Sequence, residues 1–281
     1  MEYTTLNNGV KMPMLGYGVF QIPGEDTKRC VLDAMSVGYR SIDTAQGYFN
    51  EEGVGEAVST CGLPRDELFL TTKIWISNGG YEKAKISIDE SLRKLKTDYV
   101  DLLLIHQPFN DYYGSYRAME EAYKAGKLRA IGVSNFLPDR FIDIAGFVEV
   151  TPAVNQLEAH VFQQQRIAGE ILKKYGTQLM AWSPLAQGKN NLFTNETLVA
   201  IGAKYGKTAA QVNLRFLIQS GMAVIPKSTH KERMAENFDL FDFRLTEDEM
   251  SELKSLDLGK SQFIDHHAPD VAEMFVNAGK M

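Results

Sequence analysis

Four residues in the first half of the sequence combine types that could protonate a carbonyl oxygen. They are Asp43, Tyr48, Lys73 and His106. A free tyrosine keeps its proton up to about pH 10, and a lysine cation within hydrogen-bonding distance would favour the phenolate and lower that pKa. Asp43 would keep Lys73 charged, while a neutral His106 would orient a carbonyl oxygen toward Tyr48. Because no cysteine or activated serine accompanies them, we expect the attacking group to be a hydride from a cofactor.

The pattern around these residues places them at equivalent positions. Asp43, Lys73 and His106 each stand at the C-terminal end of a predicted strand, and Tyr48 lies in the loop after the first of these strands. A lysine buried at such a position needs a neighbouring anion, which Asp43 would supply. The structural alternative is an aspartate that caps a turn, a tyrosine that covers the core and a histidine with its partners inside the core.

Short apolar stretches alternate with helical patterns along the whole chain. We expect strands at 15–19, 39–43, 68–73, 100–105, 130–134, 153–156, 178–182 and 222–225. Helices are expected at 26–36, 53–60, 81–95, 115–125, 139–147, 163–175, 196–205, 208–219, 231–237 and 246–256. Eight strands with helical crossovers predict an α/β fold, a (β/α)8 TIM barrel formed by one domain over 1–281, and an open doubly wound sheet is the alternative.

Two further features complete the predicted fold. Asn7-Asn8-Gly9 separates two short extended stretches and predicts an N-terminal β-hairpin, because asparagine and glycine tolerate positive φ. The segments after Ser228 add extra helices near the C-terminus, the last of which begins with a capping box of Thr246 and Glu249. The adjacent pair His266–His267 is expected to lie in a solvated tail.

Composition limits the function classes. The net charge of −6 gives no reason to expect a nucleic acid or an anionic membrane surface. The polar start is unlike a signal peptide, and the longest apolar runs have strand length. Two cysteines cannot make a disulfide framework, and neither has the neighbour spacing of a metal ligand. We therefore expect a cytoplasmic monomer that binds no metal.

A second cluster points to a phosphate group. Lys227–Thr229 follows the last predicted strand, and Arg233 falls in the first turn of the next helix. A lysine, hydroxyl groups, a helix N-terminus and an arginine together suit a phosphate monoester, and the loop 183–188 could wrap a pyrophosphate. A solvated basic helix end is the alternative. Gly53-Val54-Gly55 lacks a third glycine and follows a loop, so we interpret it as helix packing and not as a dinucleotide motif.

Three long segments resemble the aldo-keto reductases. They are GYRSIDTAQGYFNEEGVG at 38–55, IGVSNF at 131–136 and IPKSTHKERMAENF at 225–238. The resemblance covers nearly the whole chain and implies a catalytic tetrad of Asp43, Tyr48, Lys73 and His106, with Tyr48 as the general acid for reduction by NADPH. It implies cofactor contacts at Val19, Asp43, Ser134, Asn135, Gln156, Trp182, Ser183, Leu185, Lys227, Ser228, Thr229, Arg233, Glu236 and Asn237. It implies substrate contacts at Phe20, Tyr48, Trp75, His106 and Phe109.

Within these contacts, the resemblance also implies individual roles. Ser134, Asn135 and Gln156 match the positions that hold the carboxamide, and Trp182 matches the aromatic residue that stacks on the nicotinamide. Lys227, Ser228 and Arg233 match the site of the adenosine 2′-phosphate, and Glu236 and Asn237 match the adenine contacts.

The sequence departs from the family pattern beside the substrate. Gln107 stands after the histidine where many members carry tryptophan, which removes one apolar wall. The loop 109–116 is short, as in the microbial branch that includes diketogluconate and glyoxal reductases and protozoal prostaglandin F synthases. We expect a more open site, with Tyr112 and Tyr113 among its lining residues. Members of the family diverge in the tail from Ser261 onward.

The expected function is NADPH-dependent reduction of small aldehydes, α-dicarbonyls, or keto sugars and ketones. One alternative is a non-catalytic relative, since some family members serve as lens crystallins or channel subunits. Another is a phosphate-binding barrel lyase that uses Lys73 as a Schiff base. Asp43 argues against the lyase, because a carboxylate partner keeps the lysine charged and non-nucleophilic.

Overall fold

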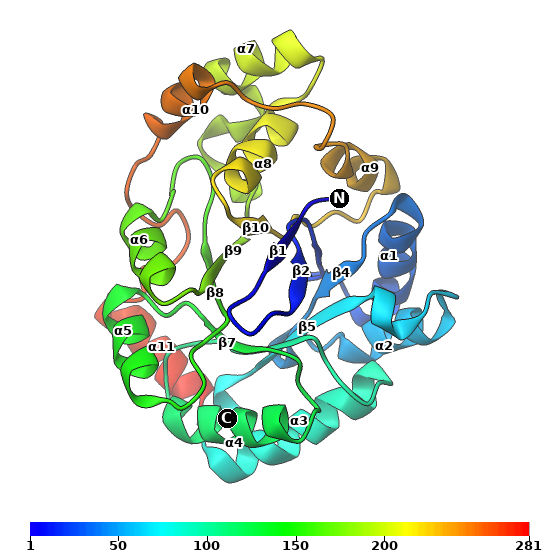
Figure 1. The fold of residues 1–281 in the computed structure, drawn as a ribbon, viewed down its shortest axis with the longest axis vertical. Helices are drawn as coiled ribbons and strands as arrows, with labels where there is room; N and C mark the ends of the chain where they lie inside the picture. The colour runs from blue at the N-terminus through cyan, green and yellow to red at the C-terminus, as the bar shows by residue number, and fades with distance from the viewer. Residues whose placement is uncertain (281) are drawn as a thin grey trace.

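Eight parallel strands form the centre of the molecule (Figure 1). The computed structural model describes residues 1–280. The strands are β3 (Tyr17–Gly18), β4 (Ser41–Asp43), β5 (Phe69–Ile74), β6 (Leu102–Ile105), β7 (Ile131–Ser134), β8 (Val154–Glu158), β9 (Gln178–Trp182) and β10 (Ala223–Val224). Each strand pairs with the next along the chain.

The sheet closes between its first and last strands. Leu15 forms a parallel bridge with Val224, the Gly16 amide donates to the Val224 carbonyl at 2.8 Å, and the Val224 amide donates to the Met14 carbonyl at 2.8 Å. The predicted (β/α)8 barrel is therefore confirmed, and the open doubly wound sheet is excluded. All eight carboxyl ends consequently face one end of the barrel, where the loops carry the predicted site.

Helices surround the strands, and all but the last of them follow the order that the sequence predicts. They are α1 (Gly24–Val37), α2 (Glu51–Thr60), α3 (Tyr81–Leu95), α4 (Tyr112–Lys124), α5 (Pro138–Phe147), α6 (Arg166–Lys174), α7 (Glu196–Tyr205), α8 (Ala209–Gln219), α9 (Lys231–Phe238), α10 (Glu247–Lys254) and α11 (Pro269–Ala278). The predicted capping box at the start of α10 is present, because Thr246 and Glu249 bond to one another's backbone amides.

The glycines of segment 53–55 act in helix packing, as interpreted from the sequence. A Cβ at Gly55 would lie 2.1 Å from the Lys94 carbonyl oxygen of α3, which no real contact allows. A Cβ at Gly53 would lie 3.0 Å from the Gly24 carbonyl oxygen of α1. Small residues here let α2 approach both neighbouring helices.

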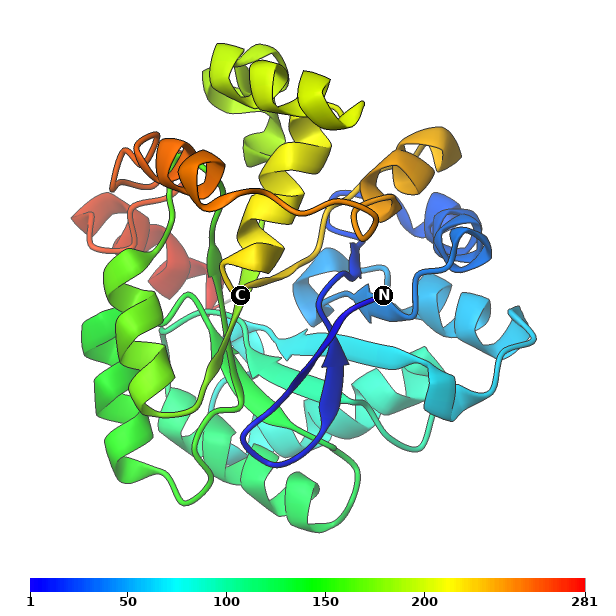
Figure 2. The same ribbon diagram turned by 45° about the horizontal axis from the view of Figure 1, so that its top comes forward.

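The predicted N-terminal hairpin, β1 (Tyr3–Thr5) and β2 (Lys11–Pro13), lies in front of the strands in Figure 2. Thr4 Oγ1 donates to Gln178 Oε1 at the start of β9 at 3.0 Å, and Asn8 Nδ2 donates to the Arg129 carbonyl before β7 at 2.8 Å. The hairpin therefore covers the amino ends of the strands, opposite the predicted site.

The expectation of a solvated tail at His266–His267 is wrong for His266. This side chain is half-buried, and its Nε2 lies 2.9 Å from Gln107 Oε1 beside β6. The following helix α11 was not predicted, and it buries Phe275 with 5% of its surface exposed. Its sequence carries a usable signal, because Pro269 occupies the first helical turn and Asp270 follows it.

Candidate active site

The four residues predicted to act together lie together at the carboxyl ends of β4, β5 and β6. Lys73 Nζ lies 2.5 Å from Asp43 Oδ1, 2.9 Å from the Thr44 carbonyl oxygen and 3.3 Å from the Tyr48 hydroxyl. The Lys73 side chain is fully buried and the Asp43 side chain is 3% exposed. The ammonium thus uses its three donors on one carboxylate, one carbonyl and the phenol.

The second oxygen of Asp43 is also bonded. Gln156 Nε2 from β8 donates to Asp43 Oδ2 at 2.8 Å. Asp43 therefore joins Lys73 on one side to Gln156 on the other, which fixes the carboxylate in the barrel interior.

Burial and charge set the protonation states of the lysine and the phenol. Burial alone would lower the pKa of Lys73, but Asp43 and Tyr48 outweigh it and the pKa lies above its ordinary value. Burial raises the pKa of Tyr48, and this exceeds the lowering by the Lys73 ammonium. Lys73 does lower the pKa of Tyr48, as expected. The expectation that this pKa is lowered overall is wrong, because burial destabilises the phenolate by more than Lys73 stabilises it.

His106 lies next to the phenol as a neutral imidazole. Its ring centroid is 5.4 Å from that of Tyr48 and 5.1 Å from that of Trp75, both edge to face. Burial, and next the Lys73 charge, hold the pKa of His106 well below 6.5. Its Nδ1 is buried without a hydrogen-bond partner among the described residues.

Predicted cofactor residues on β7 and β9 form one hydrogen-bonded layer beside His106. Asn135 Nδ2 donates to the His106 carbonyl oxygen at 3.0 Å, and Trp182 Nε1 donates to Asn135 Oδ1 at 2.8 Å. Ser134 Oγ donates to the Gln156 carbonyl oxygen at 3.0 Å. Asn135 adopts a left-handed φ of 63°, which places its side chain between histidine and tryptophan.

The predicted phosphate cluster stands between β10 and α9. The Ser228 hydroxyl accepts from the His230 amide at 3.1 Å, and the Ser228 carbonyl accepts from the buried Tyr17 hydroxyl at 2.5 Å. Lys227 and Arg233 are exposed and have no ion-pair partner within residues 1–280. Two unpaired cations beside a helix N-terminus fit an anionic phosphate group.

The remaining predicted cofactor residues border this region. Thr229 and Glu236 are half-buried, and Asn237 is buried. Glu236 Oε1 accepts from Thr208 Oγ1 at 2.8 Å, so one of its oxygens already has a protein partner. Val19 is fully buried, and its carbonyl accepts from Asn50 at 2.9 Å.

The loop after β9 has a left-handed backbone at several positions. Ser183, Ala186 and Gln187 adopt left-handed φ values of 46° to 50°. Asn213 Nδ2 from α8 donates to the Pro184 carbonyl at 2.6 Å, which fixes the loop to the barrel wall. Ser183 and Leu185 are half-buried there.

On the substrate side, aromatic residues surround the phenol and imidazole. Phe20, 48% exposed, packs on Tyr48 with ring centroids 4.9 Å apart. Phe109 stacks on Phe275 of α11 at 5.2 Å. The unpredicted helix α11 therefore packs against Phe109, one of the residues expected to line an open site, and leaves it half-buried.

Tyr112 and Tyr113 also differ from the expected lining. Both hydroxyls donate to Asp143 Oδ2 of α5, at 3.2 and 2.9 Å. They join α4 to α5 at the surface.

One functional feature that sequence reasoning missed is a buried carboxylate that holds the tail. Glu158, 5% exposed at the end of β8, accepts from Ser261 Oγ at 2.5 Å and from the Gln262 amide at 2.7 Å. Phe263 consequently packs on Trp182, with ring centroids 5.7 Å apart. The available signal was its position, two residues after Gln156 and therefore on the same face of β8.

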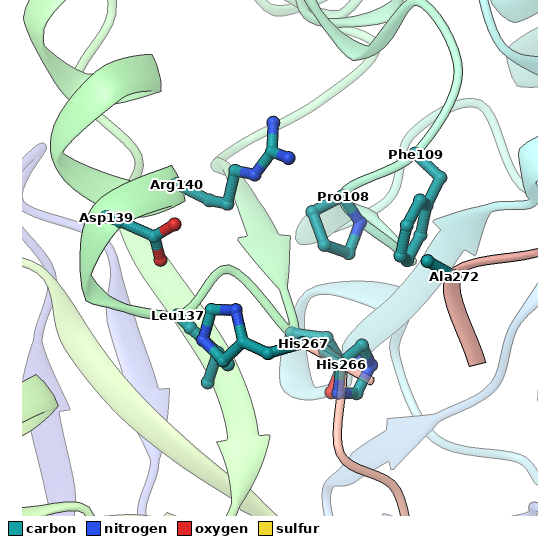
Figure 3. Close-up of a pocket in the computed structure, with 9 residues that line it drawn as sticks. Pro108, Phe109, Leu137, Asp139, Arg140, His266, His267 and Ala272 are labelled. Carbon is teal, nitrogen blue, oxygen red and sulfur yellow. The ribbon is translucent and has the colours of Figure 1, made fainter. Parts of the chain in front are cut away.

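A cavity of about 200 Å³ opens between the tail and the loops after β6 and β7. Figure 3 shows Arg140 and Asp139 on one side, Phe109 and Ala272 on the other, and the two histidines between them. It is lined by Pro108, Phe109, Asn135, Leu137, Asp139, Arg140, His266, His267 and Ala272. Asn135 connects this cavity to His106.

Comparisons with known proteins identify close relatives of this chain. The glyoxal reductase of Bacillus subtilis (strain 168) is 45% identical over 89% of this chain and 91% of its own length. The 9,11-endoperoxide prostaglandin H2 reductase of Trypanosoma cruzi (strain CL Brener) is 42% identical over 91% of this chain and 92% of its own length. Both fall within the microbial and protozoal branch that the sequence resembles.

A solved structure extends the similarity to the fold. The Bombyx mori aldo-keto reductase in complex with NADP superposes with a TM-score of 0.88 and 32% identity, over 94% of this chain and 95% of that chain. The model of the Aldo/keto reductase family matches residues 14–258. The predicted family and enzyme class are thereby confirmed, in a family that uses NADP(H). The chain belongs to the aldo/keto reductase family.

Proposed function

We propose that this protein reduces carbonyl groups of small aldehydes, α-dicarbonyls, or keto sugars and ketones to alcohols, with NADPH as reductant and Tyr48 as proton donor. The observation that carries the proposal is the buried contact of Lys73 with both Asp43 and the Tyr48 hydroxyl, at 2.5 and 3.3 Å. An ammonium held against a phenol stabilises the phenolate that remains after the proton leaves.

Each residue of the tetrad has a distinct task in this scheme. NADPH, when bound, supplies a hydride to the carbonyl carbon. The Tyr48 hydroxyl gives its proton to the carbonyl oxygen, and the Lys73 charge stabilises the phenolate left behind. Asp43 keeps the ammonium charged and directed, while the neutral imidazole of His106 orients the oxygen toward Tyr48.

The cofactor residues divide between its two ends. We assign the carboxamide to Ser134, Asn135 and Gln156, beside the tetrad. Lys227, Ser228 and Arg233 would hold the 2′-phosphate, since an exposed lysine and arginine at a helix N-terminus favour a doubly charged anion. These assignments support NADPH over NADH.

The reduction of α-dicarbonyls fits both the site and a relative. The B. subtilis relative is named glyoxal reductase, and glyoxal is the smallest α-dicarbonyl. In this chain, Trp75 packs on His106 and Phe20 packs on Tyr48, so large apolar rings lie beside the tetrad where a small carbonyl compound would bind.

The lyase alternative fits the lysine poorly. Lys73 is fully buried, donates to three oxygens and has a raised pKa, so its nitrogen is charged and lacks the lone pair that Schiff-base formation needs. Borohydride treatment with a carbonyl substrate should leave Lys73 unmodified. A non-catalytic role is disfavoured because all four members of the tetrad are present and in contact.

We further propose a monomeric protein of the cytoplasm, formed by one domain over 1–281. Both cysteines, Cys30 and Cys61, are free thiols. No helix in the described part of the chain is long and apolar enough to cross a membrane.

The proposal is tested by following NADPH oxidation with a panel of aldehydes, α-dicarbonyls and sugar acids. We expect turnover with several small carbonyl compounds, a much slower rate with NADH, and alcohols as products. Absence of turnover across the panel would contradict the proposed reaction and would favour the non-catalytic alternative.

A further inference from the structure

Gln107 directly follows the catalytic histidine and has an unusual environment for an amide. It is 7% exposed, and its Oε1 lies 2.9 Å from His266 Nε2. Because an amide oxygen can only accept, His266 donates this hydrogen bond. The contact fixes which end of the amide faces the tail and which end faces away from it.

The donor in this contact is itself held by stacking. The His266 ring lies parallel to Phe275, with centroids 5.6 Å apart and an interplanar angle of 11°. Phe275 stacks in turn on Phe109, from the loop that carries Gln107. Glu158 anchors the start of the same segment through Ser261. The imidazole therefore has one position, and it imposes one orientation on the amide.

The other end of the amide is unsatisfied. Gln107 Nε2 carries two N–H groups, and neither has a hydrogen-bond acceptor within residues 1–280. The side chain is 7% exposed, and Nε2 is not fully enclosed, so part of its surface remains open. A donor in a largely buried side chain costs free energy when it is unpaired, and that cost is removed when a ligand supplies an acceptor.

We propose that Gln107, oriented by His266, is a specificity-determining residue that selects carbonyl substrates bearing an oxygen on the neighbouring carbon. This inference rests on the proposed reductase function. The reacting carbonyl oxygen faces Tyr48 and His106. The side-chain N–H groups of Gln107 then donate to the oxygen on the neighbouring carbon of the substrate. The substrate class is therefore α-hydroxyaldehydes and α-dicarbonyls, in preference to simple aldehydes of equal size.

Glycolaldehyde and propanal test this directly, because they have the same number of non-hydrogen atoms and differ in the α-oxygen. Gln107→Met keeps the side-chain length and removes the N–H donors. His266→Phe keeps the stack on Phe275 and removes the hydrogen bond. We expect each variant to lower the ratio of kcat/KM for glycolaldehyde to that for propanal roughly five- to tenfold, mainly through KM. In the double variant the ratio should fall little further than in either single variant, because both substitutions remove the same interaction.

His267→Phe is the matched control, since this neighbouring histidine lines the same cavity but is exposed and its side chain makes no hydrogen bond within residues 1–280, so the variant changes the cavity wall without touching the Gln107 contact. We expect it to leave the ratio unchanged. The proposal would be overturned if Gln107→Met and His266→Phe lowered kcat/KM equally for both substrates, or if His267→Phe lowered the ratio as much as they do.

A binding measurement separates this inference from the reductase function. In the complex with NADP+, the side-chain amide signals of Gln107 in a ¹H–¹⁵N spectrum, assigned with Gln107→Met, should shift with glycolaldehyde and not with propanal. If the wild type turns over neither aldehyde but the signals shift selectively, the reductase proposal fails and the recognition by Gln107 stands. If the Gln107 signals shift equally with both aldehydes, or with neither, the proposed recognition of the α-oxygen by Gln107 is overturned.

Discussion

Burial shifts the pKa values of the Tyr48 phenol and the His106 imidazole in opposite directions, and both shifts favour the neutral form that the reaction needs. Burial raises the pKa of Tyr48 and lowers that of His106, so both groups stay neutral near pH 7. A proton donor must hold its proton before the reaction, and a neutral histidine does not repel the Lys73 charge. The ammonium then stabilises the phenolate only once it forms.

The pH dependence of reduction follows from these directions. Because the pKa of His106 is well below 6.5 and that of Tyr48 is above 10, kcat should be flat from about pH 6 to 9 and should fall at higher pH, as Tyr48 loses its proton. A kcat profile measured with saturating NADPH and a stable aldehyde checks this. An inflection near pH 6.5 that disappears in His106→Gln would show that the imidazole titrates in the working range.

The two tryptophans have different predicted roles and can be separated. Trp182, held by Asn135 at 2.8 Å, is predicted to stack on the nicotinamide, whereas Trp75 contacts His106 and should touch substrate. NADPH should quench intrinsic fluorescence strongly in the wild type and in Trp75→Phe, and much less in Trp182→Phe. Aldehyde specificity should shift more in Trp75→Phe. Equal quenching in the two variants would rule out the stacking assignment.

At the scale of elements, the strands and the loops that follow them supply the polar side chains of the site, and the start of a helix can complete it. The start of α9 is the clearest example, since Tyr17 of β3 fixes the Ser228 carbonyl and leaves Lys227 and Arg233 exposed beside the helix N-terminus. Such a site forms only when β3 and β10 meet in the closed barrel.

Arg233→Ala should weaken NADPH selectively. Loss of one charge-assisted bond to the 2′-phosphate costs about 1.5–3 kcal/mol, or roughly ten- to a hundredfold in Kd, while the Kd of NADH should barely change. Lys231→Ala, an exposed lysine at the start of α9, is the matched control and should have a smaller effect on both. Equal weakening of NADPH and NADH by Arg233→Ala would mean that the cluster is structural.

Sequence reasoning placed these elements well where periodicity and end signals were strong. The prediction for α3 has the observed bounds, Tyr81–Leu95, because a regular apolar stripe is bounded by Gly80 and by polar residues. The start of α6 was predicted at Gln163 but lies at Arg166, since Gln163 pairs with His160 in a backbone bridge. Helix α11 was missed because the tail was interpreted as solvated, although Pro269 and Asp270 mark a helix start. Its packing on Phe109, by contrast, joins segments far apart in the sequence and could not be predicted.

The same limit applies to the site. The types and strand-end positions of Asp43, Tyr48, Lys73 and His106 were enough to predict that they meet. The net pKa direction of Tyr48 was not predictable, because it depends on how deeply the whole barrel buries the phenol. The pairing of Gln107 with His266, 159 positions apart, likewise depends on the tail's path over the barrel.

At the scale of the whole molecule, the two ends of the barrel have different roles: the amino ends of the strands hold a stabilising network, and the carboxyl ends hold the tetrad. Asp101, fully buried before β6 at the amino end of the strands, accepts from Arg65 Nη2 at 2.8 Å, Arg129 Nη1 at 2.7 Å and the Leu70 amide at 2.9 Å. This carboxylate ties together the starts of three neighbouring strands, at the end of the barrel opposite the tetrad.

Asp101→Ala should therefore affect folding and leave catalysis intact. We expect a decrease of about 2–3 kcal/mol in the free energy of unfolding, because charge-assisted bonds are lost and the Leu70 amide is left unpaired. The kcat at a temperature where the variant is folded should match the wild type. Asp98→Ala, at an exposed aspartate three residues away, is the control and should change stability by less than about 0.5 kcal/mol. A large loss of kcat in folded Asp101→Ala would show that the two ends are coupled.

Proton donation by Tyr48 is the central step of the proposed reaction, and Tyr48→Phe tests it most directly. The variant removes the hydroxyl that Lys73 contacts at 3.3 Å and leaves the predicted cofactor residues unchanged. The measurement is the rate of NADPH oxidation with a saturating aldehyde, together with the Kd of NADPH from fluorescence quenching, in wild type and variant. We predict that kcat falls by roughly a hundred- to ten-thousandfold while the Kd stays near the wild-type value. A folded variant that keeps a substantial fraction of the wild-type kcat would contradict the assignment of Tyr48 as the proton donor.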